Sequence, residues 1–184
     1  MVFVDKLRIR VASIEDISLV QAGGCGIYRQ HFSSLWSESC LREFLDRDFS
    51  TQSLQESLSS PSQTWLIAQD GQGSLLGYAK LNWDRPEPVS GRVGAELQKI
   101  YLHSHATGRG YGSMLLKSVA DLASRRCELL WLDVLKSNVG AQRFYANHGF
   151  QVLGEIPFST DLMQIGMFVM VRLLTADAWA DSSA

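Results

Sequence analysis

The sequence predicts an α/β (α+β) fold in which helices flank a mixed central sheet. Two observations support this prediction. Strand-like and helix-like patterns alternate through the middle of the chain, and a hairpin-like pair of strands lies near each end. No repeat or low-complexity linker divides the 184 residues, so we expect one domain over residues 1–176 and a small polar tail over 177–184.

The N-terminal part begins with a strand and continues into helices. Leu7–Val11 alternates apolar and polar residues, as a half-buried strand does. Ser13 followed by Asp16 resembles a capping box, which predicts that a helix begins just after it. We expect Gly23–Gly26 to interrupt or hinge that helix, because glycine has a low helix propensity. Two more helical stretches are expected, one opened by Ser37 and one around Leu54 and Leu58.

The rest of the chain alternates strands with helices. Strand patterns cover Trp65–Ala68, Leu75–Trp83, Glu96–His103, Leu129–Val134, Phe150–Ile156 and Gln164–Leu174. Helical patterns with an apolar face begin near Gly112 and Ala141, and the second ends at Gly149. Loops are expected at Ser57–Gln63 and Asp84–Gly94, which are rich in serine, or in proline and glycine.

Composition excludes several classes of protein. Hydrophobic residues make up 46% and charged residues 20%, which is too apolar for a disordered chain. Apolar runs are far shorter than the roughly 20 residues that cross a bilayer, and the N-terminus lacks a signal-peptide pattern. The formal net charge of −2 disfavours binding to nucleic acid. We therefore expect a cytoplasmic protein with neither a membrane nor a nucleic-acid partner.

The cysteines and histidines do not form a metal-binding pattern. Cys25, Cys40 and Cys127 lie far apart, without a Cys-x-x-Cys pair. His103 and His105 would share one face of a strand, but a third ligand at suitable spacing is missing. We therefore expect no metal site, and we interpret these two histidines as loop residues.

A glycine-rich turn, Thr107–Gly112, links a predicted strand to a predicted helix. Glycine lets the backbone approach a ligand closely, and the first N–H groups of a helix have no internal partners. The turn therefore suits a phosphate or diphosphate, and a tight turn without a ligand is the alternative. The spacing of Gly108, Gly110 and Gly112 matches neither the Rossmann fingerprint nor a P-loop.

A second unit follows the strand Leu129–Val134 and reads Asn138-Val-Gly-Ala-Gln-Arg-Phe-Tyr-Ala-Asn-His-Gly-Phe. Together the two units resemble the GNAT superfamily of acyl-CoA-dependent N-acetyltransferases, over about residues 65–174. Three further segments are similar to its diamine and polyamine branch: Tyr28-Arg-Gln-His-Phe, Phe49-Ser-Thr-Gln-Ser-Leu and Gly77-Tyr-Ala-Lys-Leu-Asn. The resemblance implies a mostly antiparallel sheet of about seven strands whose central strands splay apart.

The resemblance also implies a reaction. Acetyl-CoA, as co-substrate, would give its acetyl group to a primary amine through direct attack and a tetrahedral intermediate. Glu96 would be the base that takes a proton from the ammonium group, with Asp133 in reserve, and Tyr145 would be the acid that protonates the CoA thiolate. The alternatives are structural roles: a strand-edge or substrate-attracting carboxylate, a loop cap and a core tyrosine, respectively.

The resemblance places cofactor contacts on the glycine turn, the strand before it and the helix after Leu129–Val134. These residues are Ile100, Tyr101, Leu102, Thr107, Gly108, Arg109, Gly110, Tyr111, Gly112, Ser113, Asn138, Ala141 and Phe144. The family usually has Arg or Gln where this chain has Thr107, so the side-chain donor to the diphosphate is weaker or comes from Arg109. Main-chain N–H groups are expected to do most of the binding. An N-cap is the second role considered for Asn138.

The acceptor is expected to be a small amine, with a diamine or polyamine favoured. The N-terminal helices and the loop Asp84–Gly94 would form its site. Residues 38–56 carry five acids against two bases, a balance that attracts a polyamine or simply forms a solvated helix face. Four aromatic residues would line the channel or belong to the core: Trp36, Phe44, Tyr78 and Trp83. The alternatives are an acetyltransferase acting on protein or peptide amines, and a non-catalytic acyl-CoA-binding module. A homodimer is compatible with each.

Overall fold

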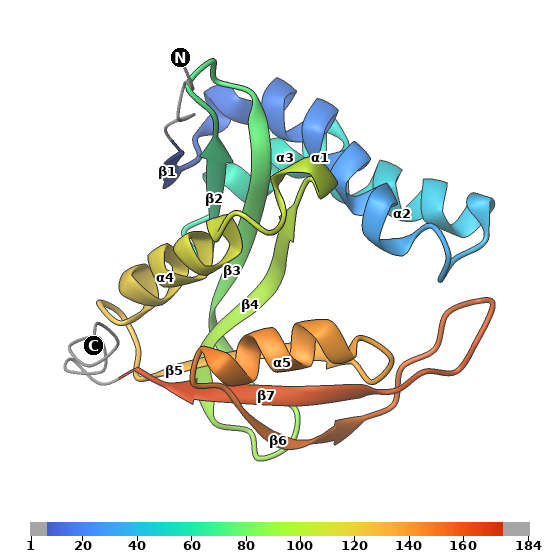
Figure 1. Ribbon diagram of the computed structural model, residues 1–184, viewed down its shortest axis with the longest axis vertical. Helices are drawn as coiled ribbons and strands as arrows, with labels where there is room; N and C mark the ends of the chain where they lie inside the picture. Colours follow the sequence, from blue (N-terminus) through green and yellow to red (C-terminus); the bar gives the residue numbers. More distant parts are fainter. Residues whose placement is uncertain (1–6, 175–184) are drawn as a thin grey trace.

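The computed structural model describes residues 7–174, which form a seven-stranded sheet flanked by helices (Figure 1). The strands are β1 (Arg8–Val11), β2 (Gln63–Gln69), β3 (Leu75–Pro86), β4 (Val93–Leu102), β5 (Leu129–Leu135), β6 (Gln151–Ile156) and β7 (Met167–Leu173). Their order is β1-β2-β3-β4-β5-β7-β6. All neighbouring pairs are antiparallel except β4 and β5. The mixed, mostly antiparallel sheet is therefore confirmed. The predicted tail over 177–184 lies outside the described residues.

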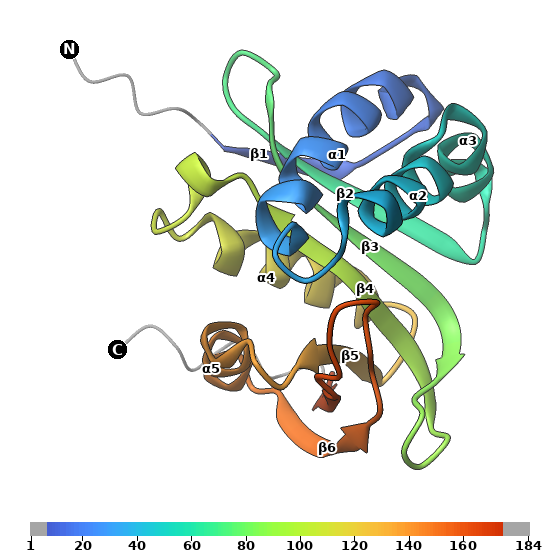
Figure 2. The same ribbon diagram turned by 90° about the vertical axis from the view of Figure 1, so that its right-hand side faces the viewer.

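Helices cover both faces of the sheet (Figure 2). They are α1 (Ile17–Phe32), α2 (Glu38–Phe49), α3 (Thr51–Ser59), α4 (Tyr111–Ala123) and α5 (Val139–Asn147), with short 3₁₀ turns η1 (Ile14–Asp16) and η2 (Ser104–Ala106). The apolar sides of α1, α2 and α3 pack with Trp65, Ile67 and Tyr78. The apolar side of α4 packs with Leu81 and Leu97 in a separate core. The two cores therefore lie on opposite faces of the sheet.

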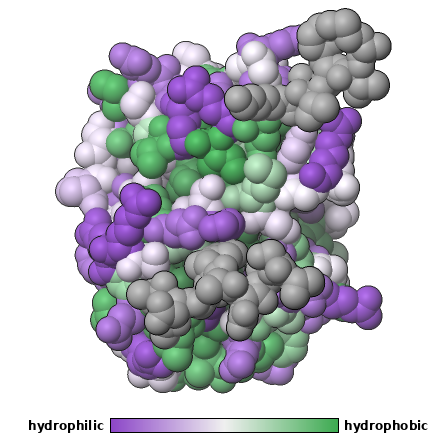
Figure 3. Space-filling view, turned by 60° about the vertical axis from the view of Figure 1, so that its left-hand side comes forward, coloured by the Kyte–Doolittle hydropathy of each residue, from purple (hydrophilic) through white to green (hydrophobic). Residues whose placement is uncertain are grey.

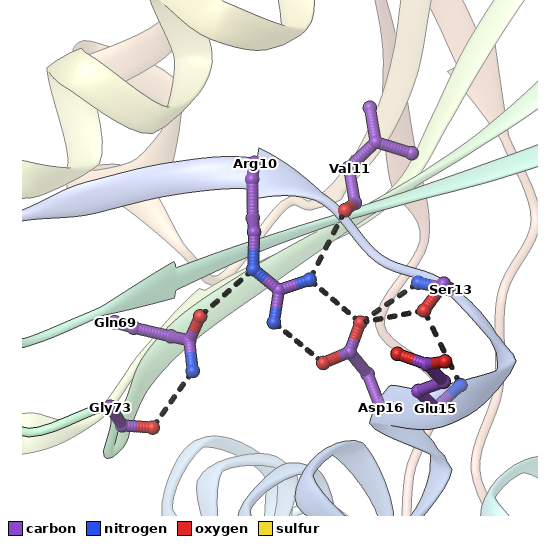
Figure 4. Close-up of polar contacts among 7 residues, drawn as sticks. All are labelled: Arg10, Val11, Ser13, Glu15, Asp16, Gln69 and Gly73. Carbon is purple, nitrogen blue, oxygen red and sulfur yellow. Dashed lines mark hydrogen bonds and ion pairs between the residues drawn. The ribbon is translucent and has the colours of Figure 1, made fainter.

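The capping box expected at Ser13 is present, and it belongs to a network that ties β1 to η1 (Figure 4). Asp16 accepts a hydrogen bond from the Ser13 backbone N–H at 2.8 Å. The Arg10 guanidinium donates two hydrogen bonds to the Asp16 carboxylate, at 2.6 and 2.7 Å, and a third to Gln69 at 3.1 Å. The bonds from Arg10 hold the pKa of Asp16 below its ordinary value.

α1 runs through Gly23–Gly26 without a break, so the interruption expected there is wrong. A Cβ atom at Gly23 would lie 2.7 Å from a methyl carbon of Leu75, and one at Gly24 would lie 2.7 Å from a ring carbon of Phe49. These two glycines let α1 approach β3 and α2 closely. That packing compensates for their low helix propensity.

Both expected loops are shorter than predicted. α3 extends to Ser59, so the serine-rich loop covers only residues 60–62. β3 continues to Pro86 and β4 begins at Val93, so a hairpin turn over 87–92 replaces the longer loop Asp84–Gly94. The last strand begins at Met167 rather than at Gln164. At both loops, regular structure extends into residues that local composition alone assigns to loops, whereas the last strand is shorter than its apolar pattern predicts.

The two central strands separate soon after they meet. β4 and β5 pair at only two positions, Ala95 with Leu130 and Glu96 with Trp131. Against β3, the register of β4 shifts so that Gln98 has no partner, which is a β-bulge. Beyond this point β4 and β5 diverge (Figure 1). The splayed central strands expected from the resemblance are therefore present.

The surface mixes apolar and polar areas. On the face drawn in Figure 3, hydrophobic residues gather in two areas that a hydrophilic band separates. No helix within residues 7–174 is long and apolar enough to cross a membrane. The same part of the chain contains no group of three or more His, Cys, Asp or Glu side chains placed to hold a metal ion.

Candidate active site

Two clefts meet between the diverging ends of β4 and β5. The first, which we call the glycine-turn cleft, has a volume of about 940 Å³ and runs past the glycine turn and the start of α5. The second, which we call the aromatic cleft, has a volume of about 550 Å³ and lies between α1, α2, β4 and β5. Tyr101, Asn138 and Tyr145 line both clefts, so the two spaces adjoin at these side chains.

The glycine turn lines the first cleft with backbone. Gly108 and Gly110 have φ angles of +74° and +77°, which glycine adopts without strain. A Cβ atom at either position would meet nothing within 4 Å. Gly110 is the N-cap of α4, and Gly112 and Ser113 in the first turn of that helix also line the cleft. Unpaired N–H groups and the positive end of the helix dipole are therefore available to an anion there.

The side chains of this turn contribute less than its backbone. The Thr107 hydroxyl donates a hydrogen bond to the Ser104 carbonyl oxygen at 2.7 Å, so it stabilises η2. Arg109 and Tyr111 do not line either cleft as the structure describes them. The rings of His103 and His105 lie 4.0 Å apart at η2, outside any strand, as expected for loop residues.

Most of the residues predicted to contact the cofactor line the glycine-turn cleft. They are Ile100, Tyr101, Leu102, Thr107, Gly108, Gly110, Gly112, Ser113, Asn138, Ala141 and Phe144. Asn138 also accepts a hydrogen bond from the Ala141 backbone N–H at 3.0 Å, so its role as the N-cap of α5 is observed. His31, which sequence reasoning did not select, reaches the same cleft from α1 and contacts the Leu102 carbonyl oxygen at 2.9 Å.

Tyr145 lies where the two clefts adjoin. Its ring packs against Phe144 and Phe150, with centroids 5.4 and 5.7 Å away. No residue among 7–174 forms a hydrogen bond with its hydroxyl, so the alternative of a core tyrosine with a satisfied hydroxyl is not observed there. Burial and the nearby charge of Asp133 raise the pKa of Tyr145 well above its ordinary value. A neutral hydroxyl therefore faces the junction throughout the neutral pH range.

Two carboxylates from neighbouring strands line the aromatic cleft. The Glu96 side chain is only 14% exposed, and it accepts a hydrogen bond from the Asn82 amide at 2.8 Å. The Asp133 side chain is exposed, but it lies within the cleft, whose walls replace part of its hydration. This desolvation and the negative charge of Glu96 raise the pKa of Asp133 to about 6, while Lys99 acts in the opposite direction. Asp133 can therefore accept a proton near neutral pH.

A buried ion pair, absent from our sequence-based predictions, occupies the α2 side of the aromatic cleft. Lys99 is only 6% exposed, and its Nζ lies 2.9 Å from an oxygen of Asp48. The ammonium group also lies over the rings of Phe44 and Tyr28, at 5.1 and 5.9 Å from their centroids. Burial opposes the charge of Asp48, but Lys99 and Arg47 hold the pKa of this carboxyl below its ordinary value. The Asp48 carboxyl is therefore ionised at neutral pH.

The mouth of the aromatic cleft is formed by segments that are distant in sequence. Phe158, between β6 and β7, contacts Trp36 edge-on with ring centroids 6.3 Å apart. The Asp161 carboxylate accepts hydrogen bonds from the Ser37 backbone N–H at 3.2 and 3.3 Å. The expected acceptor loop Asp84–Gly94 does not line this cleft.

The four candidate aromatic residues divide evenly. Trp36 and Phe44 line the aromatic cleft. Tyr78 and Trp83 are buried in the two cores.

Comparisons with known proteins agree with this geometry. The profile of the acetyltransferase (GNAT) family matches residues 26–150. An uncharacterised N-acetyltransferase of Mycobacterium tuberculosis is 33% identical over 135 residues, which cover 73% of this chain and 82% of that protein. A spermine/spermidine N(1)-acetyltransferase of Bacillus subtilis is 26% identical over 100 residues, which cover 51% of this chain and 64% of that protein. The PaiA N-acetyltransferase of Thermoplasma acidophilum, crystallised with coenzyme A, shares the fold with a TM-score of 0.71 and 22% identity, over 91% of this chain and 99% of that one.

Proposed function

The chain belongs to the GNAT family of acyl-CoA-dependent N-acetyltransferases, and we propose that it transfers the acetyl group of acetyl-CoA to a primary amine by direct attack of that amine. The main support for this proposal is the junction of the two clefts. One cleft offers backbone donors for a diphosphate, the other holds a carboxylate pair, and the Tyr145 hydroxyl lies between them.

The residues of the glycine-turn cleft fit acetyl-CoA. The N–H groups at the start of α4 suit its diphosphate, because the helix dipole and the unpaired donors act together there. The backbone of β4 beyond the bulge has no partner from β5, so the groups at Ile100–Leu102 can bond the amide-containing arm. Asn138 lies on the same path. Acetyl-CoA supplies an activated carbonyl carbon.

Glu96 and Asp133 prepare the amine for attack. An alkylammonium with a pKa near 10.4 is almost fully protonated at neutral pH and must lose a proton before it becomes a nucleophile. The carboxylate pair attracts the cation and accepts that proton. Desolvation and the negative charge of Glu96 together raise the pKa of Asp133, so Glu96 tunes the group that takes the proton.

Tyr145 provides the proton that the departing thiolate needs. Its hydroxyl carries that proton throughout the neutral range and has no competing acceptor among residues 7–174. A general acid in this position contributes about 10²–10⁴ in rate.

The similarity to the Bacillus subtilis spermine/spermidine acetyltransferase, at 26% identity, is the reason to include diamines and polyamines among the amines tested.

Thiol release from acetyl-CoA in the presence of a panel of primary amines tests the proposal. We expect Tyr145→Phe to lower kcat by about 10²–10⁴-fold with unchanged affinity for CoA. Tyr78→Phe is the matched control, because it removes a phenol hydroxyl from the core, away from both clefts. Tight CoA binding without turnover of any amine would favour a non-catalytic acyl-CoA-binding module instead. Unchanged kcat in Tyr145→Phe would exclude the acid role.

A further inference from the structure

The walls of the aromatic cleft beyond the carboxylate pair are mainly rings. Besides Tyr145, the rings that line it are those of Tyr28, Phe32, Trp36, Phe44, Tyr101 and Phe158. Tyr28 stacks on Phe32 and on Phe44, with centroid separations of 4.4 and 4.5 Å. Such walls favour an apolar body, because burying it against them releases water from both surfaces.

A second ammonium group would find no unpaired carboxylate in these walls. Apart from Glu96 and Asp133, the described charged groups lining the aromatic cleft are Arg47, Asp48 and Lys99. Asp48 is already bonded to Lys99 at 2.9 Å and to Arg47 at 3.0 Å. The three groups together carry one excess positive charge. A distal cation would therefore be desolvated near two cations, which is unfavourable.

The aromatic faces on this side are also occupied by cations. Lys99 lies over Tyr28 and Phe44, and the Arg47 guanidinium lies 5.0 Å from the centroid of Phe44. A substrate ammonium could make a cation–π contact with Tyr28 or Phe44 only by displacing these groups.

The acids of residues 38–56 do not change this balance. Asp48 is the only one of the five that lines the aromatic cleft. Glu38 pairs with Arg29 at 2.8 Å on the surface, and Glu56 lines a neighbouring polar pocket that meets the aromatic cleft at Arg47, Asp48 and Gln98. Of the five acids, only Asp48 therefore adds its charge to the cleft wall, and that charge is paired with Lys99.

We propose that the acceptor carries one cationic nitrogen on an apolar body, and that the Lys99–Asp48 pair excludes a second ammonium group from the aromatic cleft. This inference rests on the proposed function, because it concerns the amine that receives the acetyl group. The single nitrogen lies at the carboxylate pair, and the apolar body lies against the rings.

Three amines of equal length test the inference: hexylamine, 1,6-diaminohexane and 6-aminohexanoate, which end in a methyl, an ammonium and a carboxylate group. We expect kcat/KM for hexylamine to exceed that for the diamine at least about tenfold, after correction for its two equivalent amines. We expect kcat/KM for 6-aminohexanoate to be lower than that for hexylamine as well, because its terminal carboxylate would lose hydration against the rings. Equal or better turnover of the diamine or of 6-aminohexanoate would overturn the inference while leaving acetyl transfer intact. If none of the amines supports thiol release from acetyl-CoA, the proposed function itself is overturned.

Variants of the ion pair provide a second, independent test. Lys99→Met leaves the Asp48 carboxylate without its main partner, so the ratio of diamine to hexylamine turnover should rise about tenfold or more. Lys117→Met is the matched control, because Lys117 lies on α4, pairs with Asp121 and lines neither cleft. The double variant Lys99→Met with Asp48→Asn removes both charges and should restore the preference for hexylamine. A ratio that Lys99→Met leaves unchanged, with a normal melting curve, contradicts the inference.

Discussion

At the scale of single residues, the carboxylate pair depends on its neighbours. Asn82 fixes Glu96 by a hydrogen bond, and the charge of Glu96 in turn raises the pKa of Asp133. Lys99 acts against that rise. The proton affinity of the cleft is therefore a property of the group of side chains rather than of one acid.

Asp133→Asn removes the group whose pKa lies at about 6. We expect kcat/KM of the wild type to rise with pH through a limb near that value, because the ionised carboxylate accepts the proton. In Asp133→Asn this limb should disappear, and kcat/KM at neutral pH should fall about 10²–10⁴-fold. Glu96→Gln should instead move the limb to lower pH, since it removes the negative charge that raises the pKa of Asp133.

Rates of thiol release across the neutral range measure both profiles. Asp121→Asn on α4 is the control, because Asp121 forms an ion pair with Lys117 and lies outside both clefts. If the limb persists unchanged in Asp133→Asn, Asp133 is not the proton acceptor. If the pH profiles of Glu96→Gln and wild type superimpose, the charge of Glu96 does not influence the acceptor.

Asp16→Asn tests the network that joins β1 to η1. It should lower the free energy of unfolding at neutral pH by about 1–3 kcal/mol, because the hydrogen bonds from Arg10 to a charged carboxylate are lost. The folded-state pKa of Asp16 is lowered, so this stabilisation is present above the unfolded pKa near 3.9 and disappears as pH falls through the folded value.

Urea denaturation at neutral and acidic pH measures the effect. The difference between wild type and Asp16→Asn should shrink as the pH becomes acidic. Glu15→Gln, an exposed acid in the same turn, should change the free energy of unfolding by less than about 0.5 kcal/mol. A pH-independent difference would show that the loss does not arise from the ionised pair.

At the scale of elements, the position of α1 depends on glycines that look unfavourable in isolation. Gly24→Ala places a methyl group 2.7 Å from the ring of Phe49, so we expect a loss of about 1–3 kcal/mol of stability. Gly26→Ala lies in the same helix with nothing within 4 Å, so it should stabilise by about 0.5–1 kcal/mol. Thermal or chemical unfolding distinguishes the two. Equal effects would mean that helix propensity, not packing, dominates at both sites.

The bulge in β4 explains why the sequence did not reveal the ion pair. Strict alternation places Leu97 and Lys99 on the same face of a strand. The extra residue Gln98 turns Lys99 to the opposite face, toward Asp48, while Leu97 packs against α4. A bulge leaves no pattern in hydrophobicity, so the position of Lys99 could not be predicted from the sequence.

The glycine turn and the unit after Leu129–Val134 were predictable for the opposite reason. Each is a short, contiguous segment whose residue types determine its local geometry, as the positive φ at Gly110 and the cap at Asn138 show. The cleft mouth was not predictable, because Phe158 and Trp36 are brought together only by the completed sheet.

At the scale of the whole molecule, the glycine-turn cleft lies where the sheet opens between β4 and β5. A ligand in this cleft contacts β4 and the glycine turn on one side and α5 on the other. We expect acetyl-CoA to raise the free energy of unfolding by about 2.7 kcal/mol at a hundred times its Kd. Gly110→Ala should reduce this gain, because it strains a positive-φ residue that lines the cleft.

Gly91→Ala is the control for this prediction. Its φ is +78° and the space around it is open, as at Gly110, but it lies in the β3–β4 turn. Both variants should lose about 1 kcal/mol without ligand. Differential scanning fluorimetry with and without acetyl-CoA separates this common loss from the specific one. Equal ligand-induced shifts in the two variants would contradict a role for the Gly110 region in binding.

The contact between Asp161 and Ser37 joins positions 124 residues apart in the chain. Two distant stretches, residues 157–166 and the beginning of α2, therefore form the entrance to the aromatic cleft together. A mutagenesis library that diversifies only one stretch keeps half of the entrance constant and breaks its tie to the other half. Redesign of the substrate range will need paired libraries in which both stretches vary together.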